Sequence, residues 1–280
     1  MNLSVGVRYM LLATFTFTLM KVFVKYVSHI PAIEVILFRS VISLGISGFL
    51  LLRQNVGLFG NNRPILIARG VAGAVALTLN FYLIQEIPLA TVSVLTYLAP
   101  VFSTVIGVYL VREKVFPLQW VFFALSFIGI IVIQGFDVRI SGFHLLLGVL
   151  TSFFMGLAYN FVRKLNTTEH PLVIIFYFPL VLMPIASIWS YFVWVEPQGW
   201  DWLFLILVGV STQIAQFFMT KSYQSAEINK VSILNYLGLI YSLIFGYFLF
   251  EETFNFLTYI GMGLVVTGVV ANVIYKKIKT

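Results

Sequence analysis

The sequence predicts an all-α membrane protein of ten transmembrane helices, arranged as two inverted five-helix repeats. Three observations lead to this fold class. The 280-residue chain is 60% hydrophobic and only 10% charged, which is too little charge to cover a water-soluble domain of this size. Its apolar residues fall into ten runs of about 20 residues, the length that crosses a bilayer. Finally, residues 88–115 recur 139 positions later, as residues 227–254.

The ten predicted helices are separated by Pro, Gly, Asn and charged residues, which commonly interrupt apolar spans. In chain order they cover residues 5–27, 32–52, 64–84, 89–111, 117–133, 143–163, 172–193, 202–222, 228–250 and 256–275. The N-terminal segment has one Arg, Arg8, before its uninterrupted apolar stretch and no small-residue cleavage pattern, so we expect a retained helix rather than a signal peptide. The repeat supports the count, because both halves must contain the same number of helices.

The internal repeat divides the chain into residues 1–139 and residues 140–280. The two copies share polar and small residues in register, which a common apolar composition alone would not produce. The matched pairs include Val92/Val231, Ser93/Ser232, Tyr97/Tyr236, Ser103/Ser242, Gly107/Gly246 and Glu113/Glu252. Because five is an odd number, the second half must cross the membrane in the opposite sense to the first. Inverted repeats of this kind place a substrate site near mid-membrane in transporters; the alternative is a duplication that only enlarged a helical bundle.

The Lys and Arg residues predict the orientation. With the N-terminus inside, 13 of the 17 Lys and Arg residues fall at cytoplasmic helix ends and loops. The positive-inside rule therefore places both termini in the cytoplasm, and we expect a multi-pass protein of the cell's inner membrane, in contact with the lipid bilayer. The net charge of +7 then comes from these loops, so no nucleic-acid partner is expected.

Metal, cofactor and enzyme chemistry are not expected. The chain has no Cys, and His29, His144 and His170 all lie near predicted helix ends, so neither a metal site nor a Cys nucleophile is predicted. Ser47, in the sequence GISG, matches the short motif of rhomboid-like proteases, but no His lies within a span to activate it. A channel is a further alternative, although the sequence shows no ring of charges or selectivity loop.

An ordered set of motifs resembles the EamA family of the drug/metabolite transporter superfamily and covers essentially the whole chain. The motifs are Phe38 with Arg39, and residues 68–70, 80–115, 129–133, 236–254 and 263–270. The resemblance implies that the first, third, fourth, sixth, eighth and ninth helices surround a central cavity. It also implies transport, often export, of a small polar metabolite such as an amino acid, nucleoside, vitamin or nucleotide-like cofactor.

The second half departs from the family pattern at one place. Gly238 and Leu239 stand where the first half has Ala99 and Pro100. A proline-induced break with a local hinge is therefore expected in the helix over residues 89–111 only.

Uncharged polar residues within the spans are the candidates for substrate contacts. We expect the set to line the cavity, the alternative being hydrogen bonds that hold helices together. Ser93 and Tyr97 lie one turn apart on a common face, as do their mates Ser232 and Tyr236, and the two pairs are predicted to form a two-sided site. The full set is Thr18, Asn80, Tyr82, Ser93, Tyr97, Tyr159, Asn160, Gln213, Gln216, Ser232, Asn235 and Tyr236.

Arg39, Lys21 and Arg163 are predicted to be structural or gating charges. Inserting an Arg into a membrane costs about 2.5–3.5 kcal/mol, so Arg39 should face protein or water. A structural role, through helix-end carbonyls or Glu34, is favoured over attraction of an anionic group. Lys21, Arg163 and Arg69 lie near predicted helix ends, where their side chains can reach the headgroups. As repeat mates, Lys21 and Arg163 could also guard opposite mouths of the cavity.

The acidic residues predict the coupling mechanism. No Asp or Glu lies in the middle of a predicted span, and a proton-coupled carrier usually needs a buried carboxylate or His. We therefore predict a uniporter or exchanger that works by alternating access, with a proton-coupled exporter of drugs or organic cations as the alternative. The nearby cations favour an anionic or zwitterionic substrate. Gly261, Gly263 and Gly268 can pack the last helix against a second copy or within one chain, so a monomer and a homodimer both remain open.

Overall fold

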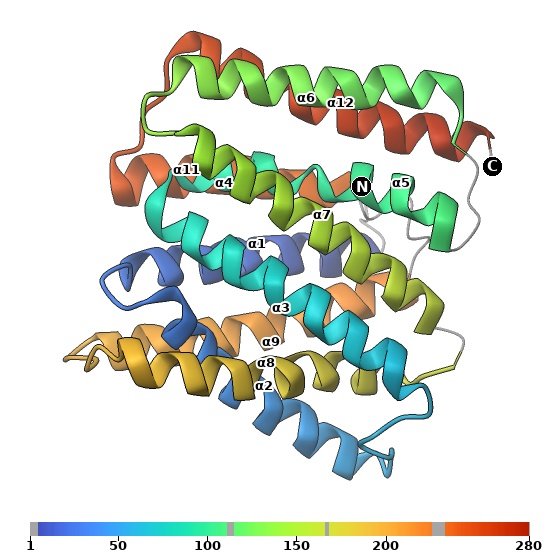
Figure 1. Cartoon of the computed structure of the whole chain (residues 1–280), viewed down its shortest axis with the longest axis vertical. Helices are drawn as coiled ribbons and strands as arrows, with labels where there is room; N and C mark the ends of the chain where they lie inside the picture. The colour runs from blue at the N-terminus through green and yellow to red at the C-terminus, as the bar shows by residue number, and fades with distance from the viewer. Residues whose placement is uncertain (1–4, 111–114, 166–167, 226–232, 280) are drawn as a thin grey trace.

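The computed structural model describes residues 5–110, 115–165, 168–225 and 233–279, and these residues form a bundle of helices without strands (Figure 1). The helices of the first half are α1 (Val5–Tyr26), α2 (Ala32–Arg53), α3 (Arg63–Glu86), α4 (Leu89–Thr96), α5 (Ala99–Leu110) and α6 (Pro117–Phe136). Those of the second half are α7 (Gly142–Leu165), α8 (Pro171–Val193), α9 (Asp201–Ser225), the 3-10 helix η1 (Ile233–Tyr236), α11 (Leu237–Phe250) and α12 (Phe256–Lys279).

The predicted number of spans is confirmed. Nine of the described segments are long and apolar enough to cross a membrane, with α4 and α5 counted as the single span Leu89–Leu110. The shorter apolar segment Leu234–Phe250 makes the tenth. Residues 228–232, where the ninth helix was predicted to begin, lie outside the described residues. Ten crossings bring both chain ends to the same side of the bundle (Figure 1).

Prolines fix the starts of three helices. Pro64, Pro117 and Pro171 stand in the first turns of α3, α6 and α8. A first-turn N–H has no partner inside its own helix, so proline loses nothing there and its fixed φ favours the helix. The breaks that the sequence marks with proline are therefore real helix ends.

The predicted span over residues 89–111 is interrupted, because α4 ends at Thr96 and α5 begins at Ala99. The ring of Pro100 cannot donate to the carbonyl of Thr96 and would clash with it in a continuous helix. The mate in the second half also changes, from the 3-10 helix ending at Tyr236 to the α-helix beginning at Leu237. The proline-induced break expected in the first-half helix is therefore present, and the second half shows a change of helix type without proline that was not predicted.

A contact between the halves lies at this change of helix type. The hydroxyl of Tyr97 donates to the carbonyls of Asn235 and Tyr236, at 3.1 and 3.3 Å. The contact links the break between α4 and α5 to the junction of η1 and α11.

Helices pair across the two halves. α1 packs on α9 and α7 packs on α3, while α2 packs on α8, α4 on α11 and α6 on α12. Exchanging the halves converts the first contact into the second and leaves the contacts of α2 with α8 and of α6 with α12 unchanged. In Figure 1, α6 and α12 lie together along the top, α2 and α8 at the bottom, and α4, α11, α7 and α1 between them. The main contacts thus run between the halves.

Residues 89–110 occupy the centre of the bundle. In the most apolar window of this span 67% of the residues are buried, whereas the corresponding share is 33–39% for the other eight long spans. Every residue of α4 from Leu89 to Leu95 is buried. The best-preserved part of the repeat therefore forms the core.

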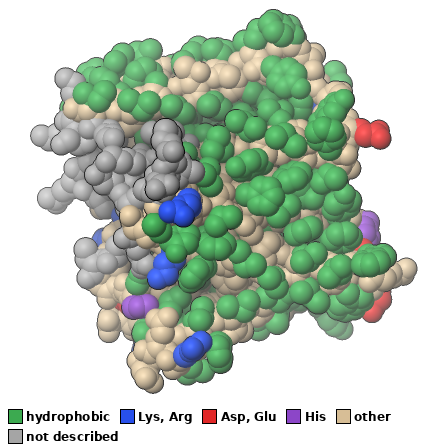
Figure 2. All heavy atoms as spheres, turned by 180° about the vertical axis from the view of Figure 1, so that it is seen from behind, with side chains coloured by type: hydrophobic (Ala, Val, Ile, Leu, Met, Phe, Trp, Pro, Cys, Tyr) green, Lys and Arg blue, Asp and Glu red, His purple; other side chains and the backbone are tan. Residues whose placement is uncertain are grey.

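The outer surface of the bundle is apolar. Large side chains that a soluble domain would bury are exposed on many helices, including Phe49, Leu52, Ile131, Phe192 and Phe248. Figure 2 shows hydrophobic side chains over most of one face, with Lys and Arg beside the grey residues and Asp and Glu at the opposite edge. This surface fits a bilayer, in which apolar side chains face lipid.

Candidate functional site

A polar cavity lies between four helices, α2 and α3 from the first half and α8 and α9 from the second. The volume of the cavity that the centre of a water molecule can occupy is about 20 Å³. A cavity needs about 10–15 Å³ by the same measure to hold one water. Its polar lining comes from Arg39, Ser43, Arg69, Thr212, Gln213 and Gln216. The cavity therefore holds one or two small polar groups rather than a whole metabolite.

Arg39 is the best-anchored cation of this cavity. It is only 5% exposed, and its Nε donates a hydrogen bond to Oγ1 of Thr212 at 3.2 Å. Its Cζ lies 5.2 Å from the ring centre of Phe178 and 6.0 Å from that of Phe81, and such contacts stabilise a cation by about 0.5–2 kcal/mol. Its Nη1 is buried and has no hydrogen-bond partner among the described residues.

The partners expected for Arg39 are not the ones it has. Glu34 instead accepts a hydrogen bond from the backbone N–H of Val195 at 3.0 Å. Arg39 donates to the hydroxyl of Thr212, in the middle of α9, and not to carbonyls at a helix end. The reason is that α9 packs against α2, which brings a side chain from the other half to the guanidinium deep in the bundle.

The prediction that Arg69 reaches the headgroups is wrong. Its Nε and Nη1 are buried and lack a hydrogen-bond partner among the described residues, and its Cζ lies 4.8 Å from the ring centre of Phe178. Phe178 can approach because Gly73 carries no side chain: a Cβ there would lie 2.9 Å from the ring. α8 therefore covers the start of α3 and draws Arg69 into the protein.

Two guanidinium groups thus share the ring of Phe178 with no counter-ion among the described residues. No described Asp or Glu lines the cavity. Like charges in a low-dielectric interior repel each other, and each intramembrane Arg costs about 2.5–3.5 kcal/mol on insertion scales. The cation–π contacts offset only part of this cost.

Two of the predicted cavity residues line this cavity, together with Arg39, which was predicted to be a structural or gating charge. Gln216 lies in its wall, and Gln213 lies beside it while donating to the carbonyl of Ser43 at 2.8 Å. Pro179, which also lines the cavity, cannot donate to the carbonyl four residues before it. That carbonyl belongs to Ile175, another lining residue, so the wall contains a potential acceptor as well as guanidinium donors.

Tyr97 and Tyr236, two members of the predicted two-sided site, contact each other where their spans change helix type. Their ring centres are 4.8 Å apart in an edge-to-face contact. Asn235 lies close by and accepts a hydrogen bond from Thr14 at 3.3 Å, while the hydroxyl of Thr18 is bound within its own helix, to the carbonyl of Thr14. The four predicted residues among these do not line the arginine cavity; they are Thr18, Tyr97, Asn235 and Tyr236.

Ser93 is buried between three helices with Lys21 and Ser242. Nζ of Lys21 donates to Oγ of Ser93 at 2.9 Å, and Oγ of Ser93 lies 2.8 Å from Oγ of Ser242. Lys21 therefore points into the protein and not to the headgroups, because α4 offers a hydroxyl within its reach. Ser232, the predicted partner of Ser93, lies outside the described residues.

The remaining predicted residues lie away from the cavity. Asn160 is fully buried and donates to the carbonyls of Ser103 and Gly156, both at 2.9 Å, which ties α7 to α5. Tyr159 is 45% exposed and Arg163 is exposed near the end of α7. Asn80 and Tyr82 are half-buried on α3 and do not line the cavity.

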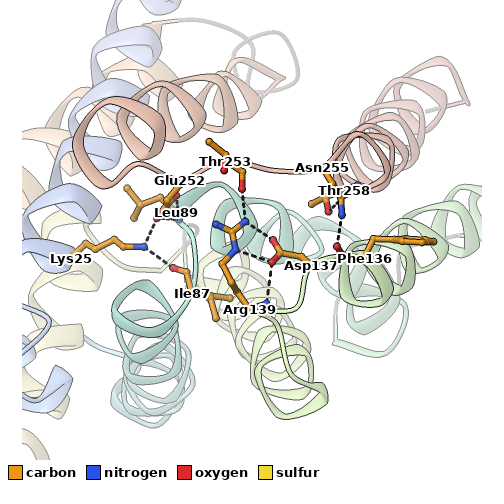
Figure 3. Close-up of polar contacts among 10 residues, drawn as sticks. All are labelled: Lys25, Ile87, Leu89, Phe136, Asp137, Arg139, Glu252, Thr253, Asn255 and Thr258. Carbon is orange, nitrogen blue, oxygen red and sulfur yellow. Dashed lines mark hydrogen bonds and ion pairs between the residues drawn. The ribbon is translucent and has the colours of Figure 1, made fainter.

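A polar network lies at the end of the bundle away from the two chain ends marked in Figure 1, and Figure 3 shows its contacts. Lys25 forms an ion pair with Glu252 and donates to the carbonyl of Ile87 at 3.0 Å. Glu252 also accepts from the backbone N–H of Leu89, at 2.9 Å for its Oε2. One carboxylate thus joins the end of α1, the start of α4 and the loop after α11.

Arg139 forms a second set of contacts in this network. It donates to Asp137 at 2.8 Å and to the carbonyl of Thr253 at 2.8 Å. The hydrogen bonds with Asp137 raise the pKa of Arg139 above its ordinary value, so the side chain stays charged. Sequence reasoning assigned no role to Lys25 or Glu252; the match of Glu252 to Glu113 in the repeat was the available signal.

The comparison with known families identifies the chain. The profile of the EamA-like transporter family matches it twice, over residues 4–135 and residues 142–274. The chain belongs to this family. Together the two matches span nearly the whole sequence, and the resemblance noted from the motifs is confirmed. The chain is accordingly a metabolite transporter of the EamA type and not an enzyme.

Curated EamA-type relatives bear transporter names. The pseudopaline exporter CntI of Pseudomonas aeruginosa (strain UCBPP-PA14) is 30% identical over 96% of each chain. Solute carrier family 35 member G1 of Homo sapiens is 29% identical over 89% of this chain and 73% of its own length. The S-adenosylmethionine uptake transporter of Rickettsia prowazekii (strain Madrid E) is 24% identical over 88% of this chain and 85% of its own.

A solved structure shares the fold. A crystal structure with 17% sequence identity superposes with a TM-score of 0.66 and covers 99% of this chain and 98% of its own. At that identity the likeness concerns the fold alone. It shows that the ten-helix arrangement has an experimental counterpart.

Proposed function

We propose that this EamA-type protein is a uniporter or exchanger that exports a small polar metabolite across the inner membrane by alternating access. The proposed moving parts are two inverted five-helix repeats, residues 1–139 and residues 140–280, with both termini in the cytoplasm. The metabolite belongs to the range of amino acids, nucleosides, vitamins and nucleotide-like cofactors. The protein acts as a monomer or homodimer in the bilayer and needs no nucleic acid.

The single observation that carries this proposal is the arginine cavity between helices of both halves. Arg39 and Arg69 come from one half, whereas Phe178 and Thr212 come from the other. A substrate group held between them touches both halves at once, and a movement of one half against the other changes the side from which it is reached. Gln213 and Gln216 supply further polar contacts in the same wall.

The ion pair of Lys25 and Glu252 serves as the closing contact at the end opposite the termini. It joins helices of both halves and is nearly shielded from solvent, with side-chain exposures of 16% and 6%. Opening that end requires the pair to separate. The described state is then closed on the proposed outer side, as expected for an exporter that loads its substrate from the cytoplasm.

The proposed mechanism does not depend on protons. The described carboxylates lie at helix ends, where Glu34, Asp137, Glu169, Asp201 and Glu252 bind backbone or cationic groups. None of them lines the cavity. Uniport or exchange therefore fits these residues better than the alternative, a proton-coupled exporter of organic cations.

The experiment is transport in liposomes that contain the purified protein. Labelled amino acids, nucleosides, vitamins and nucleotide-like cofactors that shift its melting temperature are tested for uptake, with unlabelled compound inside or outside. We expect saturable uptake that a trans-side substrate accelerates. Conductance without saturation would indicate a channel, and a strict requirement for an imposed pH gradient would contradict uniport or exchange.

A further inference from the structure

The cavity between α2, α3, α8 and α9 carries an inference about the chemistry of the transported molecule. We propose that Arg39 and Arg69 form a binding site for a carboxylate group of the substrate. This inference rests on the proposed function, because it names the chemical class that the same cavity takes.

Unused hydrogen-bond donors are the first argument. Nη1 of Arg39 and both Nε and Nη1 of Arg69 are buried without a partner among the described residues. Buried polar groups in folded proteins are nearly always hydrogen-bonded, so each exception requires an explanation. Three unpartnered guanidinium nitrogens, on two residues that line one cavity, indicate an acceptor that is not part of the described chain.

The charge of the cavity is the second argument. Two guanidinium groups lie over the same ring, at 5.2 Å for Arg39 and 4.8 Å for Arg69. No described carboxylate lines the cavity. An anion between the two groups would remove their mutual repulsion and satisfy their donors together, whereas a neutral ligand would satisfy only the donors.

The size of the cavity and its neutral lining select the class of anion. The space of about 20 Å³ suits one small group, so the rest of the metabolite must lie outside this cavity. A carboxylate has two oxygens and about four lone-pair sites, and it can accept from two Arg side chains at once. The neutral side chains of Thr212 and Gln216 complete the wall without adding an opposing charge.

Phe178 has a positioning role in the proposed site. Its ring supports both guanidinium groups, and Gly73 leaves the space for it, since a Cβ on Gly73 would lie 2.9 Å from the ring. The site is therefore assembled only when α8 lies against α3. Carboxylate binding and the packing of the two halves are coupled through this ring.

The test measures carboxylate binding without transport. The purified full-length protein is melted in detergent with sodium acetate and with acetamide, its neutral counterpart of nearly the same shape, at constant ionic strength. Sodium chloride and sodium phosphate are the other anions. We expect acetate to raise the melting temperature in a saturable way and acetamide to leave it unchanged. Equal stabilisation by chloride, or stronger stabilisation by phosphate, would overturn the assignment to a carboxylate.

Variants locate the effect. Arg69→Gln should weaken the apparent affinity for acetate about ten- to a hundredfold, the range expected for loss of a hydrogen-bonded charge. Arg69→Lys keeps the charge without the planar guanidinium and should weaken it less. The matched control is Arg53→Gln, which removes one positive charge from an exposed position at the end of α2. An unchanged acetate response in Arg69→Gln would contradict the proposal, and Arg69→Lys supplies the comparison if Arg69→Gln does not fold.

The two proposals fail separately. Acetate binding that depends on Arg69, without transport of any tested metabolite, would overturn the transport cycle and leave the carboxylate site standing. Saturable transport, together with an acetate-induced shift in melting temperature that is the same in the protein and in Arg69→Gln, would overturn the site alone.

Discussion

Tyr97 and Tyr236 stand 139 positions apart, and their rings meet edge to face with centres 4.8 Å apart. Each lies where its span departs from a regular α-helix, Tyr97 between α4 and α5 and Tyr236 at the end of η1. The hydroxyl of Tyr97 donates to two carbonyls of the other segment. Tyr97 and Tyr236, which are equivalent in the repeat, thus join the two spans where each departs from a regular α-helix.

Removing the hydroxyl in Tyr97→Phe should lower the melting temperature of the purified protein. The ring contact remains, but the carbonyls of Asn235 and Tyr236 lose a donor, a loss of about 1 kcal/mol for a typical hydrogen bond. Tyr191→Phe is the matched control, because Tyr191 is 83% exposed on α8. Identical melting of the two variants would show that the hydroxyl contributes nothing.

Glu252→Gln should strongly destabilise the end of the bundle opposite the termini. Removing one partner of a buried ion pair leaves an uncompensated charge and costs about 3–5 kcal/mol. The double variant with Lys25→Met should recover part of that loss, since no isolated charge remains. Melting of each variant in detergent measures the effect. Glu251→Gln, at the exposed neighbouring position, is the control, and equal melting of the two Glu→Gln single variants would contradict a closing role.

Gly129→Ala should destabilise the contact between α6 and α12. The added Cβ would lie 2.7 Å from the carbonyl oxygen of Gly261 and 2.8 Å from the backbone nitrogen of Val265. Overpacking against backbone atoms costs about 1–3 kcal/mol. Gly135→Ala on the same helix is the control, because nothing lies within 4 Å of its added Cβ. The prediction fails if thermal unfolding does not separate these two variants.

Arg39→Gln should keep the fold and lose transport. Among the described residues its side chain hydrogen-bonds to a neutral hydroxyl and forms no ion pair, so the substitution breaks no buried ion pair there. Loss of a charged contact to substrate should slow uptake about tenfold or more. Size-exclusion chromatography and melting report the fold, and uptake into liposomes reports function. Aggregation of Arg39→Gln together with normal behaviour of Arg39→Lys would instead favour the structural role.

The sequence predicted the spans well, because span length and hydropathy are local properties. Ten runs predicted ten helices, and Pro64, Pro117 and Pro171 marked real starts. The interruption before Pro100 was also predicted, because proline acts on its own helix. The change of helix type after Tyr236 was not predicted, because no proline marks it in the sequence.

The candidate site was only partly predictable. Arg39, Gln213 and Gln216 were selected as polar residues within spans, and they do line one cavity. Arg69 and Lys21 were assigned to the headgroups because they lie near predicted helix ends. Both long side chains point inward instead, Arg69 toward Phe178 and Lys21 toward Ser93. Distance from a helix end does not indicate which neighbour covers that helix.

The sequence by itself determined the family, the number of helices and the duplication, since each of these is recorded in the order and periodicity of residues along one chain. The tertiary structure decided which charges are paired and which are not. That outcome depends on side chains from distant segments meeting in three dimensions. Glu252 reaches Lys25 and neutralises it, whereas no carboxylate of the described chain reaches Arg39 or Arg69. In a low-dielectric interior, where charges are screened only by their direct neighbours, this difference separates a closing contact from a proposed binding site.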